Sequence, residues 1–385
     1  MTVANEVPAE ADALSFSKAE YEARWARVRD AMAAAGAELL IVDCVEHMNY
    51  LFGYSPPAAI YQPAVLPLEG NPFGVIRSLD LPTFDEQSPG VASIAFEDWD
   101  DPLDVLATAL RERGWSGKRI AVELDSHFLP VDRYQAMQRK LPDATFVDFS
   151  GKLRVIRLFK SPAEIDVMRR VAKIADIGMQ ASIDTAGAGV NERDCAAALY
   201  AAVMKAGADS MRSALMASGS RTASFHGRLG HHVLETGDML HVESIPLLLG
   251  YGARLMRSTL IGAPTPEQSD NAAKLIAFQE RQFEAMVPGA AASKVDAVLR
   301  SAMLSSGLRQ DYRNITGYTL GFIGLPITSD FTRTFWPGAD WVLAPGMVFH
   351  MYTSACGMAF SDTVLVTERG SECLTRTQRR LFVRS

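Results

Sequence analysis

Two short segments of the sequence carry histidine together with an acidic or phenolic residue two positions further on. In MLHVESI these residues are His241 and Glu243, and in MVFHMY they are His350 and Tyr352. Successive side chains of a β-strand point to opposite faces, so the members of each pair share a face. If the two strands are neighbours, that face gathers one carboxylate, two imidazoles and a phenol. Such a cluster suits a reaction with a carboxylate nucleophile and an imidazole proton shuttle.

Two more candidates lie in loops: His226 in GSRTASFHGRLGHH and Tyr318 in ITGYTLG. One reaction that this set could carry out begins with the attack of Glu243 on an electrophilic carbon that is bonded to nitrogen. His226 protonates the departing nitrogen and then deprotonates the water that clears the acyl-enzyme. Tyr318 or Tyr352 donates a hydrogen bond to the developing charge. The alternative for His226 is a solvated histidine, which is the default in a loop rich in Ser, Gly and Arg.

The other polar residues of these strands also have ordinary structural explanations. Glu243 is either a functional carboxylate or one half of an ion pair with Arg254 or Arg257. The two arginines either bind a substrate carboxylate or neutralise Glu243. His241 and His350 are either site residues or core histidines.

Composition restricts the class of protein. The chain has 385 residues, a net charge of −7, 48% hydrophobic and 22% charged residues, which is ordinary for a soluble enzyme. No basic stripe indicates nucleic acid, and no apolar stretch approaches the roughly 20 residues of a membrane span. The N-terminus lacks the pattern of a signal peptide, and the four cysteines form no C-x-x-C pair. We therefore expect a cytoplasmic protein that acts on a small molecule, without nucleic-acid or membrane partners.

Helical and strand patterns alternate in the first part of the sequence and separate in the second. The alternation up to residue 150 indicates an α/β domain, whereas helices followed by antiparallel-type strands indicate an α+β domain. The predicted strands cover residues 39–43, 64–76 (a hairpin around Glu69-Gly70-Asn71), 119–124 and 145–149, and the predicted helices cover 18–35, 101–113, 130–141, 193–206, 266–286 and 294–305. A further helix is expected to begin after Ser161, because Ser161 and Glu164 form an N-cap and N3 pair.

The order of several motifs resembles the creatinase/aminopeptidase P/methionine aminopeptidase superfamily, the pita-bread enzymes. These motifs are KSPAEIDVMRR, ETGDMLHVES, ITGYTLGFIGLP and APGMVFHMY followed by FSDTVLVTERGSECLT. The resemblance implies a creatinase-type α/β N-terminal domain over residues 16–150 and an α+β pita-bread catalytic domain over 158–385. It also implies a homodimer in which the N-terminal domain of one subunit helps to close the partner's site.

The metal ligands of the superfamily do not carry over. The family pattern has two aspartates eleven residues apart, then a histidine and two glutamates, and these positions hold Glu243, Arg254, Tyr318, Tyr352 and Ser361. Two divalent cations need several oxygen donors and usually a histidine, and an arginine at such a position repels a dication. We therefore expect neither a metal nor another cofactor.

Two metal-free hydrolase groups of the superfamily share parts of the pattern. Creatinase has a catalytic histidine in the loop ahead of the site strand, at the position of His226. It has glutamates, however, where this chain has Met256 and Tyr352. The guanidinium and carboxylate recognition that creatinase implies is therefore incomplete.

The resemblance to ectoine hydrolase extends further. That group shares the glutamate at Glu243, the histidine at His226, G-Y-x-x-G at 317–321 and G-M-x-F-H at 346–350. The resemblance implies that Glu243 is a covalent nucleophile toward a cyclic amidine. The segment SPPAAIY at 55–61 lacks the aromatic richness of that group's substrate loop, which leaves the exact substrate open.

The sequence thus predicts a metal-independent hydrolase of a C–N bond in a small nitrogenous solute, either an ectoine-like cyclic amidine or a creatine-like compound. Glu243 and His226 are the predicted catalytic residues. The predicted substrate contacts are Tyr61, His241, Arg254, Arg257, Tyr318, His350 and Tyr352. One alternative is an Xaa-Pro-type metallopeptidase-like enzyme with a rearranged metal site. Its ligands would be His226, His241, His350 and Glu243. The other is a non-catalytic pita-bread binding module.

Overall fold

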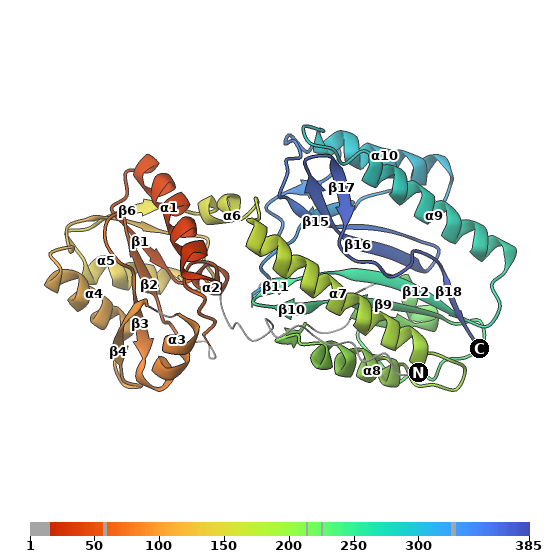
Figure 1. Ribbon diagram of the computed structural model, residues 1–385, viewed down its shortest axis with the longest axis horizontal. Helices are drawn as coiled ribbons and strands as arrows, with labels where there is room; N and C mark the ends of the chain where they lie inside the picture. The colour runs from red at the N-terminus through yellow and green to blue at the C-terminus, as the bar shows by residue number, and fades with distance from the viewer. Residues whose placement is uncertain (1–15, 57–59, 89, 213–214, 225, 325–328) are drawn as a thin grey trace. The chain divides into compact units, whose positions relative to one another are not determined.

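The chain folds into two compact units: one holds the described residues up to Arg157 together with Gly324, and the other holds Leu158–Ile323 and Ser329–Ser385. The structure is a computed structural model that describes residues 16–56, 60–88, 90–212, 215–224, 226–324 and 329–385 (Figure 1). Among these residues no helix is both long and apolar enough to cross a membrane.

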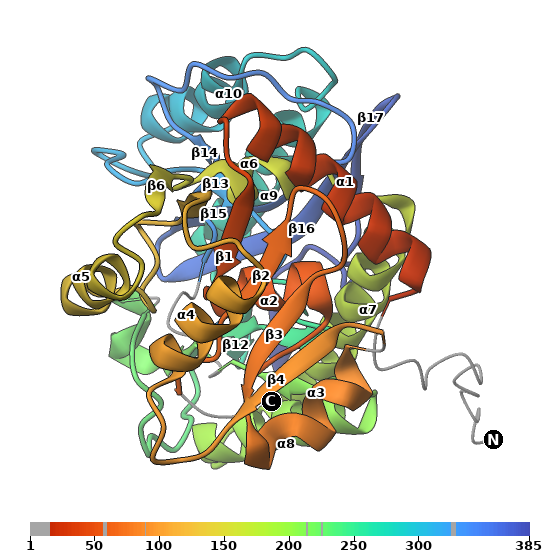
Figure 2. The same cartoon turned by 90° about the vertical axis from the view of Figure 1, so that its left-hand side faces the viewer.

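The first unit is an α/β domain around a mixed sheet with the strand order β4-β3-β2-β1-β5-β6. Its elements are α1 (Lys18–Ala34), β1 (Leu39–Val42), α2 (Val45–Phe52), β2 (Ala64–Pro67), β3 (Phe73–Arg77), the 3₁₀ helix η2 (Ser78–Asp80), α3 (Leu81–Gln87), β4 (Ala92–Phe96), α4 (Pro102–Glu112), β5 (Arg119–Val122), α5 (Val131–Lys140), β6 (Thr145–Asp148) and α6 (Lys152–Ile156). β1 pairs antiparallel with β2 and parallel with β5, and β2 pairs antiparallel with β3 as the predicted hairpin. Figure 2 shows α4 and α5 on one side of β1, β2 and β3 and α1 on the other.

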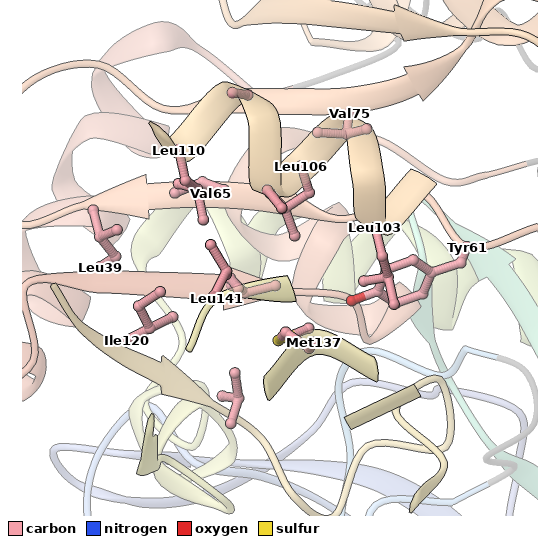
Figure 3. Close-up of a cluster of buried hydrophobic side chains, with 14 of the residues drawn as sticks. Leu39, Tyr61, Val65, Val75, Leu103, Leu106, Leu110, Ile120, Met137 and Leu141 are labelled. Carbon is pink, nitrogen blue, oxygen red and sulfur yellow. The ribbon is translucent and has the colours of Figure 1, made fainter. Parts of the chain in front are cut away.

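An apolar core between this sheet and its helices holds the first unit together. Leu39 of β1 and Val65 of β2 lie in one buried cluster with Leu106 and Leu110 of α4 and Met137 of α5 (Figure 3). Each side chain of this size contributes about 1.5–3 kcal/mol when it is fully buried. Every second residue of β1, Leu39 and Ile41, contributes to this core, as the pleat of a strand requires.

The second unit is an α+β domain with a large sheet in the order β14-β13-β15-β16-β12-β9-β8. Its elements are α7 (Pro162–Thr185), α8 (Glu192–Lys205), β7 (Ser210–Met211), β8 (Leu215–Ser218), the 3₁₀ helix η3 (Gly219–Ala223), β9 (Met239–Ser244), β10 (Pro246–Leu248), β11 (Tyr251–Gly252), β12 (Leu255–Ile261), α9 (Pro266–Glu284), α10 (Ala292–Ser305), β13 (Gly317–Thr319), β14 (Thr334–Phe335), β15 (Val348–Ala355), β16 (Met358–Thr367), β17 (Gly370–Cys373) and β18 (Phe382–Arg384). β17 pairs with β16, β18 pairs with β12, and β7, β10 and β11 form a small separate sheet.

Four helices flank this sheet. α7 packs against β9 and β12 and has α8 beside it, whereas α9 packs against β15 and β16 and has α10 beside it (Figure 1). α7 begins with the predicted capping box, because the Ser161 hydroxyl accepts from the Glu164 backbone and the Glu164 carboxylate accepts from the Ser161 backbone. Such a box satisfies two backbone donors that the first turn leaves open.

Strand alternation gives β15 two different sides. Phe349 and Met351 lie in a buried apolar cluster with Phe283 of α9 and Val295 of α10. The residues between them along the strand point to the opposite face. We call this opposite face of the large sheet the inner face, and it carries the side chains of His350 and Tyr352 of β15.

Arg257 of β12 lies on the side away from the inner face and is held entirely by the protein. Its guanidinium donates to Asp362 Oδ1 at 2.9 Å and to backbone oxygens of Met256, Ser361, Thr377 and Gln378. These bonds use all five of its N–H groups. Both Arg257 and Asp362 are only 1% exposed.

Arg257→Met is therefore expected to lower the free energy of unfolding by about 3–5 kcal/mol, because it removes the close charged partner of the buried Asp362 carboxylate, and Arg379 Nε lies 4.0 Å from its other oxygen. Chemical denaturation followed by circular dichroism measures this change. The control is Arg376→Met, which removes an exposed pair with Glu372 and should cost less than about 1 kcal/mol. Equal costs for the two variants would contradict the structural role of Arg257.

Candidate functional site

A row of cross-strand neighbours defines the centre of the inner face. Glu243 of β9 lies opposite Met256 of β12, Met256 lies opposite Ser361 of β16, and Ser361 lies opposite Tyr352 of β15. Residues directly opposite each other in a sheet have side chains on the same face. Tyr318 of β13 likewise lies opposite His350 of β15, so strand register brings the residues at four of the five family ligand positions onto this face, and Arg254 joins them through a direct contact with Glu243.

The Glu243 carboxylate is fully buried and asymmetrically bonded. Its Oε1 accepts from Arg254 Nε at 2.8 Å. Among the described residues, Oε2 has no hydrogen-bond partner. Arg254 lies just before β12, and its backbone N–H and C=O both bond to the Thr363 hydroxyl, at 2.9 and 3.0 Å. One carboxylate oxygen is thus fixed, and the other is available to a ligand.

The Arg254 guanidinium extends from Glu243 to two further residues. Its Nη1 donates to the Tyr318 phenol oxygen and, at 2.7 Å, to Ser329 Oγ. Burial lowers the pKa of Arg254, but the negative charge of Glu243 opposes this, and the net pKa is raised. Arg254 therefore remains a fixed positive charge in the site.

His350 lies next to this ion pair. Its Nδ1 is 2.9 Å from the Tyr318 oxygen, and its Nε2 is 3.9 Å from Glu243 Oε1. The Nε2 atom has no hydrogen-bond partner among the described residues. Burial, reinforced by the charge of Arg254, holds the pKa of His350 well below its usual range. Burial likewise raises the pKa of Tyr318, so a neutral imidazole and a neutral phenol adjoin the ion pair.

His241 and His226 lie toward the β8 edge of the inner face. His241 is fully buried and lies opposite Ala217 of β8. Burial lowers the pKa of His241 to about 3, and the charge of His226 adds to this effect. His226 is exposed, and the next residue, Gly227, would place a side-chain Cβ 3.3 Å from Ala217. The His226 loop therefore lies over the strand that neighbours His241.

Aromatic rings line the β13 and β15 side of the site. The Tyr318 ring is 5.1 Å from the ring of His350 and 6.1 Å from that of Tyr352, and His350 and Tyr352 stack at 5.5 Å. The ring of Phe331 lies 4.9 Å from Tyr318 and is 60% exposed. Burial raises the pKa of Tyr352, whose phenol oxygen accepts from Asn314 Nδ2 at 3.4 Å. Such a wall suits a flat or cationic ligand.

Two of the predicted substrate contacts are Arg257 and Tyr61, and both are held by other parts of the protein. Arg257 points away from the inner face and has no donor left for a substrate, as described above. Tyr61 belongs to the buried core cluster of the first unit, where the Arg133 guanidinium lies 4.2 Å from its ring centroid. Neither placement supports a direct role in substrate binding. The site also includes Ser329 and Phe331, which no sequence pattern indicated because they come from a loop without a periodic pattern.

The donor set does not fit the metal site of the superfamily. Glu243 is the one carboxylate among the five aligned positions, and it is already paired with Arg254 at 2.8 Å. A dication there would meet a fixed guanidinium, a serine hydroxyl and two phenols that are held neutral. The described residues also contain no group of three His, Cys, Asp or Glu side chains arranged to hold a metal ion.

Residues 166–368 match metallopeptidase family M24, and residues 24–159 match the creatinase/prolidase N-terminal domain. The chain belongs to metallopeptidase family M24. The predicted superfamily and the predicted combination of a creatinase-type α/β domain with a pita-bread catalytic domain are thereby confirmed.

Individual relatives of this M24 protein are hydrolases. It is 26% identical over 407 residues to the ectoine hydrolase of Halomonas elongata, which covers 96% of this chain and 99% of the relative. It is 26% identical over 397 residues to a creatinase of Bacillus sp., with 94% and 92% covered. The structure of an Xaa-Pro dipeptidase from Bacillus anthracis shares the fold, with a TM-score of 0.83, 22% identity and 94% and 99% covered. The chain is therefore a hydrolase of the M24 family.

The buried neutral histidines predict how stability depends on pH. The pKa values of His241 and His350 are lower in the folded protein than the ordinary 6.5, so below pH 6.5 the unfolded chain binds more protons than the folded chain. The free energy of unfolding should therefore fall as the pH drops from 6.5 toward 3, by up to about 1 kcal/mol per pH unit for each group. His241→Asn and His350→Asn should each flatten this slope in denaturant titrations. The exposed His231, changed to Asn, is the control that should leave the slope as it is.

Proposed function

We propose that this M24 protein is a metal-independent hydrolase that opens a C–N bond in a small nitrogenous solute of the ectoine-like cyclic amidine or creatine-like type. The observation that carries the proposal is the asymmetric bonding of Glu243. Arg254 holds one oxygen of its buried carboxylate, while the other has no partner among the described residues. A carboxylate held in this way is oriented for attack on carbon and is shielded from bulk water.

The first step forms a bond between Glu243 Oε2 and the electrophilic carbon. The C–N bond then breaks as the nitrogen takes a proton from His226, which leaves the acyl-type group on Glu243. Water, deprotonated by His226, attacks the same carbon and releases Glu243 as a carboxylate. The sum of these steps is the addition of one water molecule across the C–N bond, with enzyme groups returned to their starting states.

Arg254 and Tyr318 have supporting roles in this mechanism. The Arg254 guanidinium stabilises the Glu243 carboxylate that is released when water attacks. The neutral Tyr318 phenol donates a hydrogen bond to the negative charge that develops on the substrate. The aromatic rings of Tyr352 and Phe331 favour a planar amidinium or guanidinium, because such cations are attracted to ring faces.

The similarity to a solved Xaa-Pro dipeptidase, at 22% identity, shows a shared fold and does not favour the metallopeptidase alternative. The ion pair between Arg254 and Glu243 argues against it. A binding module without catalysis would not need the buried Glu243 carboxylate with one oxygen left without a partner among the described residues. It would not need the loop that carries His226 either.

The homodimer and the cytoplasmic location remain parts of the proposal. The homodimer rests on the resemblance to the superfamily. The location is supported by the cysteines, since Cys44, Cys195, Cys356 and Cys373 are all free thiols. Free thiols suit a reducing compartment.

The first test of the proposal concerns metals. Purified protein should hold less than stoichiometric transition metal by plasma mass spectrometry, and its activity should persist in excess chelator, since the aligned positions offer one carboxylate that is already paired. Activity is assayed by mass spectrometry on ectoine, creatine and N-acyl amino acids. A chelator-sensitive activity that Mn²⁺, Zn²⁺ or Fe²⁺ restores would favour the metallopeptidase alternative.

The second test concerns the nucleophile. Glu243→Gln should fold and bind substrate but lose about 10³-fold or more in kcat, because the nearly isosteric amide does not form an acyl-enzyme. Acid quenching of the wild-type reaction should reveal a mass adduct on the peptide that contains Glu243. The exposed Glu235, changed to Gln, is the matched control and should retain full activity. Near wild-type turnover by Glu243→Gln would make water activated by His226 the better mechanism.

His226→Ala belongs to the same test. It should also lower kcat severely, and exogenous imidazole should restore part of the activity, because a proton shuttle can be replaced from solution. The exposed His231→Ala is the control. In the double variant with Glu243→Gln the loss should be much smaller than the product of the separate losses, since both groups serve one sequence of steps.

A further inference from the structure

The loop that carries His226 is joined at both ends to one buried carboxylate. Glu192, the first residue of α8, is fully buried. Its Oε2 accepts from the Ser218 hydroxyl at the end of β8 and from the Arg221 guanidinium in η3. Its Oε1 accepts from the backbone N–H of Gly230 at 2.5 Å. Residues on both sides of His226 are therefore held together through a single side chain.

A second bridge strengthens the same arrangement. Arg221 Nη1 donates to the backbone oxygen of Arg228 at 2.9 Å. Gly230 is the residue that allows the close approach, because a Cβ there would lie 2.8 Å from both Arg221 Nη1 and Glu192 Oε1. A side chain at this position would therefore push aside the ends of the Arg221 and Glu192 side chains and disturb their contacts. We call the contacts of Glu192 with Ser218, Arg221 and Gly230 the loop clamp.

The charge of Glu192 is what makes the clamp strong. Burial raises the pKa of this carboxyl, but the hydrogen bonds from Arg221, Ser218 and Gly230 outweigh that effect and the net pKa is lowered. Hydrogen bonds to an ionised acceptor are roughly twice as strong as neutral ones.

The chain after the loop is held independently of the clamp. The Glu192 backbone N–H donates to His232 O at 2.9 Å, and Leu234 N–H donates to Val190 O at 2.8 Å. These backbone bonds anchor residues 232–234 against the start of α8 whatever side chain residue 192 has. The Glu192 carboxylate therefore joins the end of β8 to the loop, whereas residues 232–234 are held through the backbone.

We propose that Glu192 is a positioning residue, which holds residues 218–224 and 226–230 of the loop so that the imidazole of His226 stays over the inner face next to His241. The proposal rests on the proposed function, in which His226 moves the proton. An exposed loop residue samples many orientations unless its backbone is fixed, and a displacement of about 1 Å in a reacting group can cost about 100-fold in rate. The clamp provides this fixation without burying His226.

The test uses Glu192→Gln in the full-length protein. A second variant, Gly230→Ala, places a methyl group against the side-chain ends of Arg221 and Glu192. Hydrogen exchange followed by mass spectrometry should show about tenfold faster exchange in peptides of residues 219–230, with the rest of the protein unchanged. With ectoine as the probe, kcat should fall about 10- to 100-fold while KM changes much less. Ser161→Ala, which removes the cap of α7 without touching the loop, is the stability control and should change neither readout.

A double-mutant cycle separates positioning from a general structural effect. In the His226→Ala background, Glu192→Gln should cause no further loss of kcat, because the group that it positions is absent. Unchanged loop exchange in both clamp variants, or an equal loss of kcat in the two backgrounds, would overturn the proposal. Full activity of His226→Ala would instead reject the proposed role of His226, and with it any catalytic consequence of the clamp.

Discussion

The buried ion pair of Glu243 with Arg254 is the interaction on which the inner face depends. Withdrawing two charges from water costs several kcal/mol for each ion, and the cost is recovered only when every charged group has close, well-directed partners. Arg254 meets this condition by donating to Glu243, Tyr318 and Ser329. These bonds join β9, β13 and the loop before β14 at one point. The pair thereby fixes the positions of the groups around it and leaves one oxygen of Glu243 for chemistry.

The same pair explains how a family named for its metals can hold a site of another kind. A guanidinium neutralises a buried carboxylate as a cation would, and it stays in place because its pKa is raised. It does not, however, lower the pKa of a bound water to near neutrality, which is the main contribution of a catalytic dication. In the proposed mechanism the nucleophile is therefore the carboxylate that the guanidinium orients.

The sequence predicted the strands, their faces and most of the inner face, but it did not separate Arg254 from Arg257. Alternation alone places Glu243 beside His241 and Tyr352 beside His350, because it depends only on the period of a strand. The face to which each arginine side chain points depends on the exact start of β12. Its contacts depend on partners such as Asp362, which is more than 100 positions away from Arg257 in the sequence. Tyr61 lay in a predicted loop region, yet its ring packs in the first core. Ser329 arrives from a segment whose sequence has no period, so no local signal marks it.

Burial decides which histidine of the site can exchange protons. His241 and His350 are held neutral, since their surroundings exclude water and their pKa values lie far below neutrality. An imidazole of that kind accepts or donates hydrogen bonds but is a poor general acid near neutral pH. His226 remains in contact with solvent. An exposed side chain on a loop has more conformational freedom than a buried one. The buried carboxylate of Glu192 bonds to both ends of the loop and limits this mobility. The imidazole of His226 remains exposed to solvent. A proton shuttle on this fold therefore requires a rigid loop more than it requires a buried histidine.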